Sequence, residues 1–213
     1  MKPINEILKE NPIVPSGCDG PKFEAGDIYF VMLKAMEALI KERNTDWKLI
    51  LTDENKHVIG QVALWYSWDE RFKGDVRKGL MIRGNVGTGK SLIVQALCKI
   101  IMAYEILVPC FLHASELYDL YMRGDVDGID IAKKRAYTII DDVGVEPIET
   151  KNYGNVKEPF NDVFDYRYRN NKRTIITTNL TPSEIEETYG TRIIDRFREC
   201  MNDLVLDGES FRR

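Results

Sequence analysis

The sequence has little of what holds small disulfide-bonded or zinc-bound domains together. Its 213 residues include four cysteines and two histidines, and no two cysteines have the C-x-x-C spacing of a zinc or redox site. We therefore expect reduced thiols, with Cys98 and Cys110 in the core, and neither disulfide bonds nor a zinc site.

Long apolar runs and a strong excess of one charge are also missing. No stretch approaches the length of a membrane span, and residues 1–18 lack the apolar centre of a signal peptide, so we expect a cytoplasmic protein without a membrane partner. The 30 basic and 34 acidic side chains give a net charge of −4. Because this charge does not attract nucleic acid, any contact with DNA needs a local basic patch.

Glycine is concentrated in one segment, GNVGTGKS, which fits the pattern G-x-x-x-x-G-K-[ST]. The segment follows the apolar run GLMI (79–82) and precedes a stretch with apolar residues at helical spacing (91–105). An ordinary glycine turn is the alternative, but strand, glycine loop and helix in this order are typical of a loop that binds phosphate at a helix N-terminus. The predicted nucleotide-binding residues are Gly84, Asn85, Val86, Gly87, Thr88, Gly89, Lys90 and Ser91. Lys90 would bridge the outer phosphates of the nucleotide, and the Ser91 hydroxyl would bind Mg²⁺.

Two further apolar runs end in polar side chains. YTIIDD (137–142) ends in Asp141, expected beside Ser91 with Mg²⁺ held through water, and Asp142, expected to position an attacking water. TIITTNL (174–180) ends in Asn179, a neutral amide that can sense the γ-phosphate. The alternatives are a solvated turn for the acidic pair and a helix cap for the second strand end.

The segment GTRIIDRFRE (190–199) places Arg192 and Arg196 four residues apart on one helical face. An arginine that reaches the γ-phosphate bound by a neighbouring subunit stabilises the charge of the transition state. The alternative is that these arginines pair with Asp195 or Glu199 on the surface.

Basic and aromatic residues are interleaved in two places, as in proteins that bind single-stranded nucleic acid. The first patch contains Tyr166, Arg167, Tyr168, Arg169, Lys172 and Arg173, and the second contains Tyr118, Tyr121, Arg123, Lys133, Lys134 and Arg135. Cations at a helix C-terminus are also favourable by themselves, so both interpretations stay open.

Helical and apolar strand patterns alternate along the chain, which predicts an α/β fold with a parallel sheet covered on both faces. We expect a helical N-terminal appendage in residues 1–45, with docking of a partner as the alternative to simple packing, and a nucleotide-binding core in residues 46–213. Periodicity predicts helices over 26–43, from an N-cap at Asp53, from an N-cap at Ser115, over 155–172 and over 181–200. Strands are expected near 106–114 and 202–208, with a strand or connector at 44–52.

Five segments in this order resemble the DnaC/DnaI/IstB group of AAA+ ATPases: GNVGTGKS, YTIIDDVGVEP, TIITTNLTPSEI, GTRIIDRFRE and LDGESFRR. The resemblance runs from about residue 53 to the end. It implies a P-loop AAA+ fold and an ATPase that uses ATP and Mg²⁺. It also implies that ATP promotes a homo-oligomer, which binds single-stranded DNA and loads a replicative ring helicase.

By position in this group, Lys90 and Ser91 match the Walker A site, and Asp141 and Asp142 match the Walker B site. Asn179 matches the first sensor, and Arg192 and Arg196 match the segment that holds the trans-acting arginine. Two departures stand out: the N-terminal part lacks the cysteine cluster of some loaders, and the Walker B pair is Asp-Asp where many AAA+ proteins have Asp-Glu, so we expect slow hydrolysis.

Other functions stay open at this point. A transposition helper of the IstB kind shares the same core motifs, and a scaffold gated by nucleotide would need little turnover. A small-molecule phosphotransferase also has a phosphate loop, but it requires a second substrate site and a lid bearing arginines.

Overall fold

The computed structural model describes residues 23–43, 46–105, 108–152 and 155–208. The chain forms two compact units, each of which is described by itself. The first unit comprises residues 1–76, 87–107 and 206–213, and the second comprises 77–86 and 108–205. None of the described helices combines the length and the apolar character needed to cross a bilayer.

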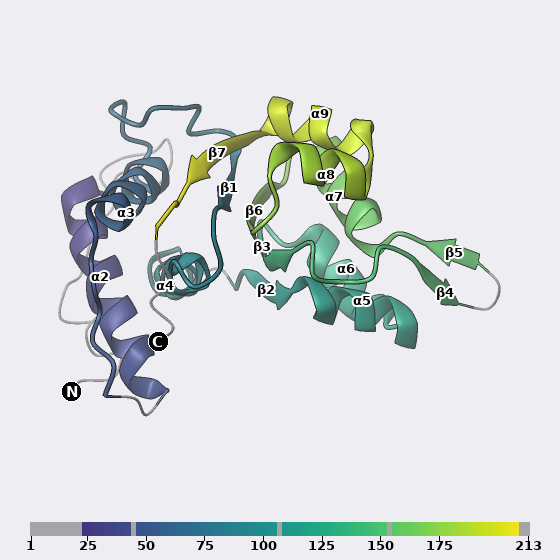
Figure 1. The fold of residues 1–213 in the computed structure, drawn as a ribbon, viewed down its shortest axis with the longest axis horizontal. Coiled ribbons are helices and arrows are strands. Elements are labelled where there is room, and N and C mark those ends of the chain that lie inside the picture. Colours follow the sequence, from purple (N-terminus) through teal and green to yellow (C-terminus); the bar gives the residue numbers. More distant parts are fainter. Residues whose placement is uncertain (1–22, 44–45, 106–107, 153–154, 209–213) are drawn as a thin grey trace. The chain divides into compact units, whose positions relative to one another are not determined.

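The described residues of the first unit form the helices α2 (Ala25–Glu42), α3 (Asp53–Tyr66) and α4 (Lys90–Tyr104). Helix α2 packs against both α3 and α4 (Figure 1). Its predicted apolar stripe is buried from Ile28 to Leu39. The ring of Phe23 lies 5.7 Å from the ring of Tyr66 and 5.5 Å from that of Tyr104, which joins the start of α2 to the ends of the other two helices.

The second unit contains the predicted parallel sheet. Its strands are β1 (Gly79–Arg83), β2 (Cys110–His113), β3 (Tyr137–Val143), β6 (Arg173–Thr178) and β7 (Met201–Val205). They are ordered β2-β3-β6-β1-β7, and every neighbouring pair is parallel. The carboxyl ends of all five strands therefore lie at one edge of the sheet, the edge at which open α/β sheets bind ligands.

Helices and a hairpin complete the described part of the second unit (Figure 1). The helices are α5 (Ala114–Arg123), α6 (Val126–Lys134), α7 (Pro159–Arg169), α8 (Pro182–Tyr189) and α9 (Thr191–Cys200). The hairpin consists of β4 (Thr150–Asn152) and β5 (Asn155–Lys157).

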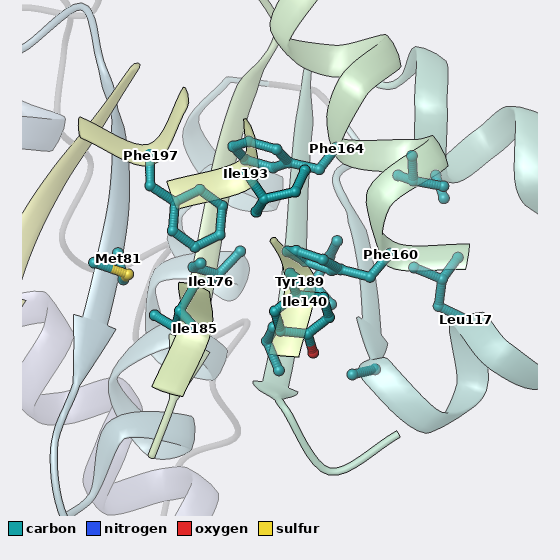
Figure 2. Close-up of a cluster of buried hydrophobic side chains, with 14 of the residues drawn as sticks. Met81, Leu117, Ile140, Phe160, Phe164, Ile176, Ile185, Tyr189, Ile193 and Phe197 are labelled. Carbon is teal, nitrogen blue, oxygen red and sulfur yellow. The ribbon is translucent and has the colours of Figure 1, made fainter. Parts of the chain in front are cut away.

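Aromatic rings and branched side chains form the core on one face of this sheet, as Figure 2 shows. Met81, Ile140 and Ile176 lie in one row across β1, β3 and β6 because their strands pair in that register. Phe164 on α7 packs with its ring centre 4.7 Å from that of Phe197 on α9, in an edge-to-face arrangement. Helices α7, α8 and α9 are thus fixed on this face through apolar contacts.

Several local predictions were wrong. Helix α3 does begin at Asp53, but its N-cap is Thr52, whose hydroxyl accepts from the backbone N–H of Asn55. Ser115 lies inside α5, and His113 occupies the N-cap position.

The helix predicted over 155–172 begins at Pro159, because 155–157 form β5. The helix predicted over 181–200 is divided at Gly190, whose φ of 87° and ψ of 159° are accessible to glycine alone without strain. No strand forms in the described part of segment 44–52, which is a connector there.

Candidate active site

The predicted phosphate loop joins β1 to α4, and its glycines adopt the backbone conformation that the motif requires. Gly84, Gly87 and Gly89 all have positive φ, at 147°, 85° and 100°. Gly89 is the N-cap residue of α4, and its left-handed conformation turns the chain into the helix. The three glycines allow the loop to coil into a short path that ends at a helix N-terminus.

The loop residues are divided between the two units. Gly84, Asn85 and Val86 follow β1 in the second unit, and Gly87, Thr88 and Gly89 precede α4 in the first. Among them, Asn85 and Val86 are exposed and Thr88 is buried.

The end of the loop is anchored to α3. Asn55 donates its side-chain amide to the carbonyl of Thr88 at 3.0 Å, while its amide oxygen lies 3.3 Å from the backbone nitrogen of Thr52 and completes the capping box of α3. One side chain therefore closes the start of α3 and fixes the residue before Gly89. Sequence reasoning missed Asn55, because its role depends on a contact across 33 positions.

The N-terminus of α4 has the charge that a phosphate site needs. Lys90 opens the helix and is 4 % exposed, and Ser91 follows it half-buried. The first turn contains no acidic residue that would oppose an anion. The positive end of the dipole of a 15-residue helix and the Lys90 ammonium group thus favour a phosphate here.

The acidic pair lies at the carboxyl end of β3. Asp141 is fully buried, and its Oδ1 accepts a hydrogen bond of 2.5 Å from the hydroxyl of Thr177 on β6. The same hydroxyl accepts from the backbone N–H of Asp142 at 2.9 Å. Thr177 therefore fixes both residues of the pair, a role that the sequence did not reveal beyond the polar character of this strand end.

Asp142 has a backbone conformation that is uncommon for residues other than glycine. Its φ is +56°, and it lies in a bulge where the pairing of β3 with β6 shifts between Ile140 and Val143. Left-handed residues other than glycine carry strain and concentrate at functional sites. The bulge redirects the chain just after the buried Asp141, so that Asp142 is half-buried rather than enclosed.

A histidine joins the acidic pair. His113 ends β2 opposite Asp141, and its Nδ1 lies 3.5 Å from Oδ2 of Asp141. One ligand atom from each of His113, Asp141 and Asp142 falls within 4.8 Å of the others. Oδ2 of Asp141 is buried without a hydrogen-bond partner, which suits a group that binds a cation directly or through water. The rule that parallel strand ends share an edge could have identified His113.

Asn179 follows β6 at the same sheet edge, next to Thr178, which pairs in register with Val143. The structure therefore brings the acidic pair and the proposed sensor to one edge of the second unit. Ser91 belongs to the other unit, and its predicted proximity to Asp141 stays a prediction.

The two candidate arginines both contact Asp165, a buried residue of α7. Nη2 of Arg192 lies 2.5 Å from Asp165 Oδ2, and Nη1 of Arg196 pairs with Oδ1. The Arg196 side chain is 15 % exposed and lies 4.9 Å from the ring centre of Tyr168, whereas the Arg192 side chain is 66 % exposed. Asp165 therefore holds α9 to α7 through two arginines of unequal exposure.

This pairing corrects the partners expected for the arginines. Asp195 pairs with Arg198 instead, at 2.8 Å, and Glu199 accepts from the Tyr168 hydroxyl at 2.6 Å.

Each of the two basic patches contains one buried residue. Arg167 is fully buried, so it is no surface contact for DNA. Tyr121 is 6 % exposed and donates to Asp162, which also pairs with Lys133 at 2.8 Å. Burial raises the pKa of Tyr121 well above its ordinary value, and its bond to Asp162 adds to this effect.

Comparison with known proteins gives a fold rather than a close relative. No family model matches the sequence, and no curated protein is similar to it. Among solved structures, the DnaC helicase loader matches with a TM-score of 0.59 and 19% identity, covering 76% of this chain and 94% of that one. DnaI matches with a TM-score of 0.58 and 20% identity, and the match covers 78% of this chain and 88% of that one.

A structure of the replication initiator DnaA bound to AMPPCP and single-stranded DNA also matches, with a TM-score of 0.56 and 17% identity. The match covers 76% of this chain and 49% of the DnaA chain. These similarities show that the chain has the fold of the DnaC and DnaI structures.

Proposed function

We propose that the chain binds and hydrolyses ATP in DNA replication and delivers a ring helicase to single-stranded DNA. The observation that carries the proposal is the phosphate loop, with three glycines at positive φ and Lys90 at the N-terminus of α4. The similarity to DnaC and DnaI, and to DnaA bound to AMPPCP and single-stranded DNA, supports the role in replication.

In this proposal, Lys90 binds the outer phosphates, and Ser91 and Asp141 hold Mg²⁺. The buried Oδ2 of Asp141, which no hydrogen bond satisfies, fits this role. Bound Mg²⁺ would neutralise charge on the phosphate oxygens. Asp142 accepts a hydrogen bond from the attacking water and orients it, and Asn179 bonds to the γ-phosphate or to that water.

Arg192 or Arg196 would act on ATP bound by a neighbouring subunit, so that ATP promotes a homo-oligomer. Within one chain, however, both arginines are paired with Asp165. This observation favours a second candidate, a scaffold in which ATP sets the state of assembly and turnover is negligible.

Replacement of Lys90 by alanine tests the nucleotide site. We expect the variant to fold and to lose tight Mg-ATP binding in a calorimetric titration, because the loop loses its one side-chain cation. Lys99→Ala on the same helix is the matched control and should bind normally. Normal affinity of a folded Lys90→Ala protein would contradict the proposal.

Phosphate release with and without single-stranded DNA then separates the two candidates. Stimulated turnover supports the ATPase, whereas tight binding without turnover at any protein concentration supports the scaffold. Affinity capture from the source cells, followed by reconstitution with the captured protein, decides whether the partner is a ring helicase.

A further inference from the structure

A basic pocket of about 220 Å³ lies in the second unit, where β1, β6 and β7 begin. This is the edge of the sheet opposite to Asp141, because all five strands are parallel. Its charged lining consists of Arg77, Lys78, Arg167, Lys172 and Arg173, with Glu199 as the one carboxylate. Five positive charges and one negative charge give the lining a formal charge of +4. A pocket of this sign is notable in a chain whose net charge is −4.

Arg167 is the buried centre of this charge. It is fully buried, and no carboxylate pairs with it among the residues that the structure describes. Its guanidinium donates to the Thr174 hydroxyl at 2.9 Å and to the carbonyls of residues 132, 133, 135, 136 and 173. Burial lowers the pKa of Arg167 to about 10, which still leaves it charged at neutral pH.

These bonds define what Arg167 can contribute. Three of the carbonyls belong to the last turn of α6 and its cap, where the helix dipole is negative and stabilises a cation. Its five N–H groups face six acceptors, so Arg167 has no donor left for a ligand. Arg167 therefore adds positive potential to the pocket without contacting what binds there. Buried charges are ordinarily paired with an opposite charge, and an anion bound in the pocket would supply that charge for Arg167.

The other cations of the pocket are set by a fixed turn between α7 and β6. Asn171 has a φ of +48°, which asparagine tolerates, and the backbone N–H of Lys172 donates to the carbonyl of Arg167 at 2.9 Å. No carboxylate pairs with Lys172 in the described part of the chain. Arg173 next to it donates to the Tyr137 hydroxyl at 3.1 Å, and Arg77, in the turn that precedes β1, is exposed.

We propose that this pocket binds a phosphate group, with Arg77 and Lys172 as its ligands and Arg167 as a buried source of positive potential. Arginine and lysine donors are the usual partners of phosphate oxygens, and such contacts position nucleic-acid strands on proteins. The phosphate belongs to the backbone of single-stranded DNA. The pocket shares no residue with the proposed ATP site, and only the choice of single-stranded DNA as the source of the phosphate rests on the proposed function.

The test compares two double variants of the full chain. Both also carry Lys90→Ala, so that binding of a phosphate probe by the phosphate loop does not contribute to the comparison. Arg77→Gln/Lys172→Gln removes two charges from the pocket. Lys34→Gln/Arg71→Gln removes two exposed charges that do not line it and serves as the control. Each protein is titrated with a labelled oligothymidylate by fluorescence anisotropy and with inorganic phosphate by phosphorus NMR.

We expect the pocket variant to bind the oligonucleotide about tenfold more weakly or worse than the control. The slope of log affinity against log salt should fall by about 1.4, which is about 0.7 for each of two lost contacts to a single strand. If the pocket variant binds inorganic phosphate more weakly but binds the oligonucleotide as the control does, the pocket is a phosphate site and the phosphate does not come from DNA. Unchanged binding of both probes would overturn the proposal. If the double variant unfolds at a lower temperature than the control, Lys172→Gln alone, which changes a residue beside a turn, gives the same comparison.

Discussion

Replacing Asp165 by asparagine would measure what the arginine cluster between α7 and α9 contributes to stability. The side chains of Asp165 and Arg196 are 11 % and 15 % exposed, and removing one partner of a buried pair costs about 3–5 kcal/mol. Arg192 and Arg169 are each 66 % exposed, so each loss adds at most about 1 kcal/mol. Asparagine keeps one acceptor, which restores about 1 kcal/mol. We expect the free energy of unfolding to fall by about 3 kcal/mol.

The assay must report on the unit that contains Asp165. The three tryptophans, Trp47, Trp65 and Trp68, all belong to the first unit, so their fluorescence does not report on the unit that contains Asp165. Urea unfolding followed by far-ultraviolet circular dichroism includes the helices of the second unit. With a slope of about 2–3 kcal/mol per molar urea, the expected loss moves the midpoint down by about 1 M.

Arg198→Gln is the control for this experiment, because Arg198 and Asp195 form a pair in which both side chains are 63 % exposed. Its cost should stay below about 1 kcal/mol. If Asp165→Asn lowers the midpoint no more than this control does, the cluster is not a buried ion pair and the reasoning is refuted.

Three further outcomes follow from the structure. Thr177→Val should lower the free energy of unfolding by about 1–3 kcal/mol, because Asp141 loses its buried donor, and an unchanged urea midpoint would contradict this. Burial raises the pKa of Cys98 to about 11 from 9.0, so the folded state keeps a proton that the unfolded state releases. Stability should therefore fall as pH rises above about 9, and less steeply in Cys98→Ala when unfolding is compared at about pH 8 and about pH 10. If Arg192 acts in trans, mixing Arg192→Ala with Asp142→Asn protein should restore phosphate release, since such an arginine contributes about 10³-fold or more, whereas no rescue at any ratio would exclude Arg192.

The elements that carry motifs could be predicted from the sequence because local signals agree there. β1, α4, β3 and β6 all join an apolar run to glycines or polar residues at its end. The errors arose where local and tertiary signals differ. The apolar spacing of residues 181–200 continues across Gly190, and the break depends on its backbone conformation. The hairpin β4–β5 has strands of three residues, too short for a periodic signal.

The candidate site was predicted to the level of strand ends and no further. The pattern of the strands was enough to predict Asp141 and Asn179 at strand ends, and the structure has both at one edge of the sheet. Thr177 gains its role from register, which a single sequence does not specify, whereas the direction of the strands could have placed His113 at this edge. The partner of Arg192 was missed because Asp165 lies 27 positions away on another helix, where periodicity gives no information.

The left-handed backbone of Asp142 bears on which sequences this fold can accept at that position. Aspartate and asparagine tolerate a φ of +56° better than other residues with a side chain, because a short polar group can bond locally. A glutamate there would have to adopt the same angle without that advantage, or the bulge of β3 would have to rearrange around it. The conformation of the main chain thus favours aspartate at the second position of the pair. In evolution, an exchange of Asp-Asp for Asp-Glu could proceed by a change in the strand geometry first and in the carboxylate second.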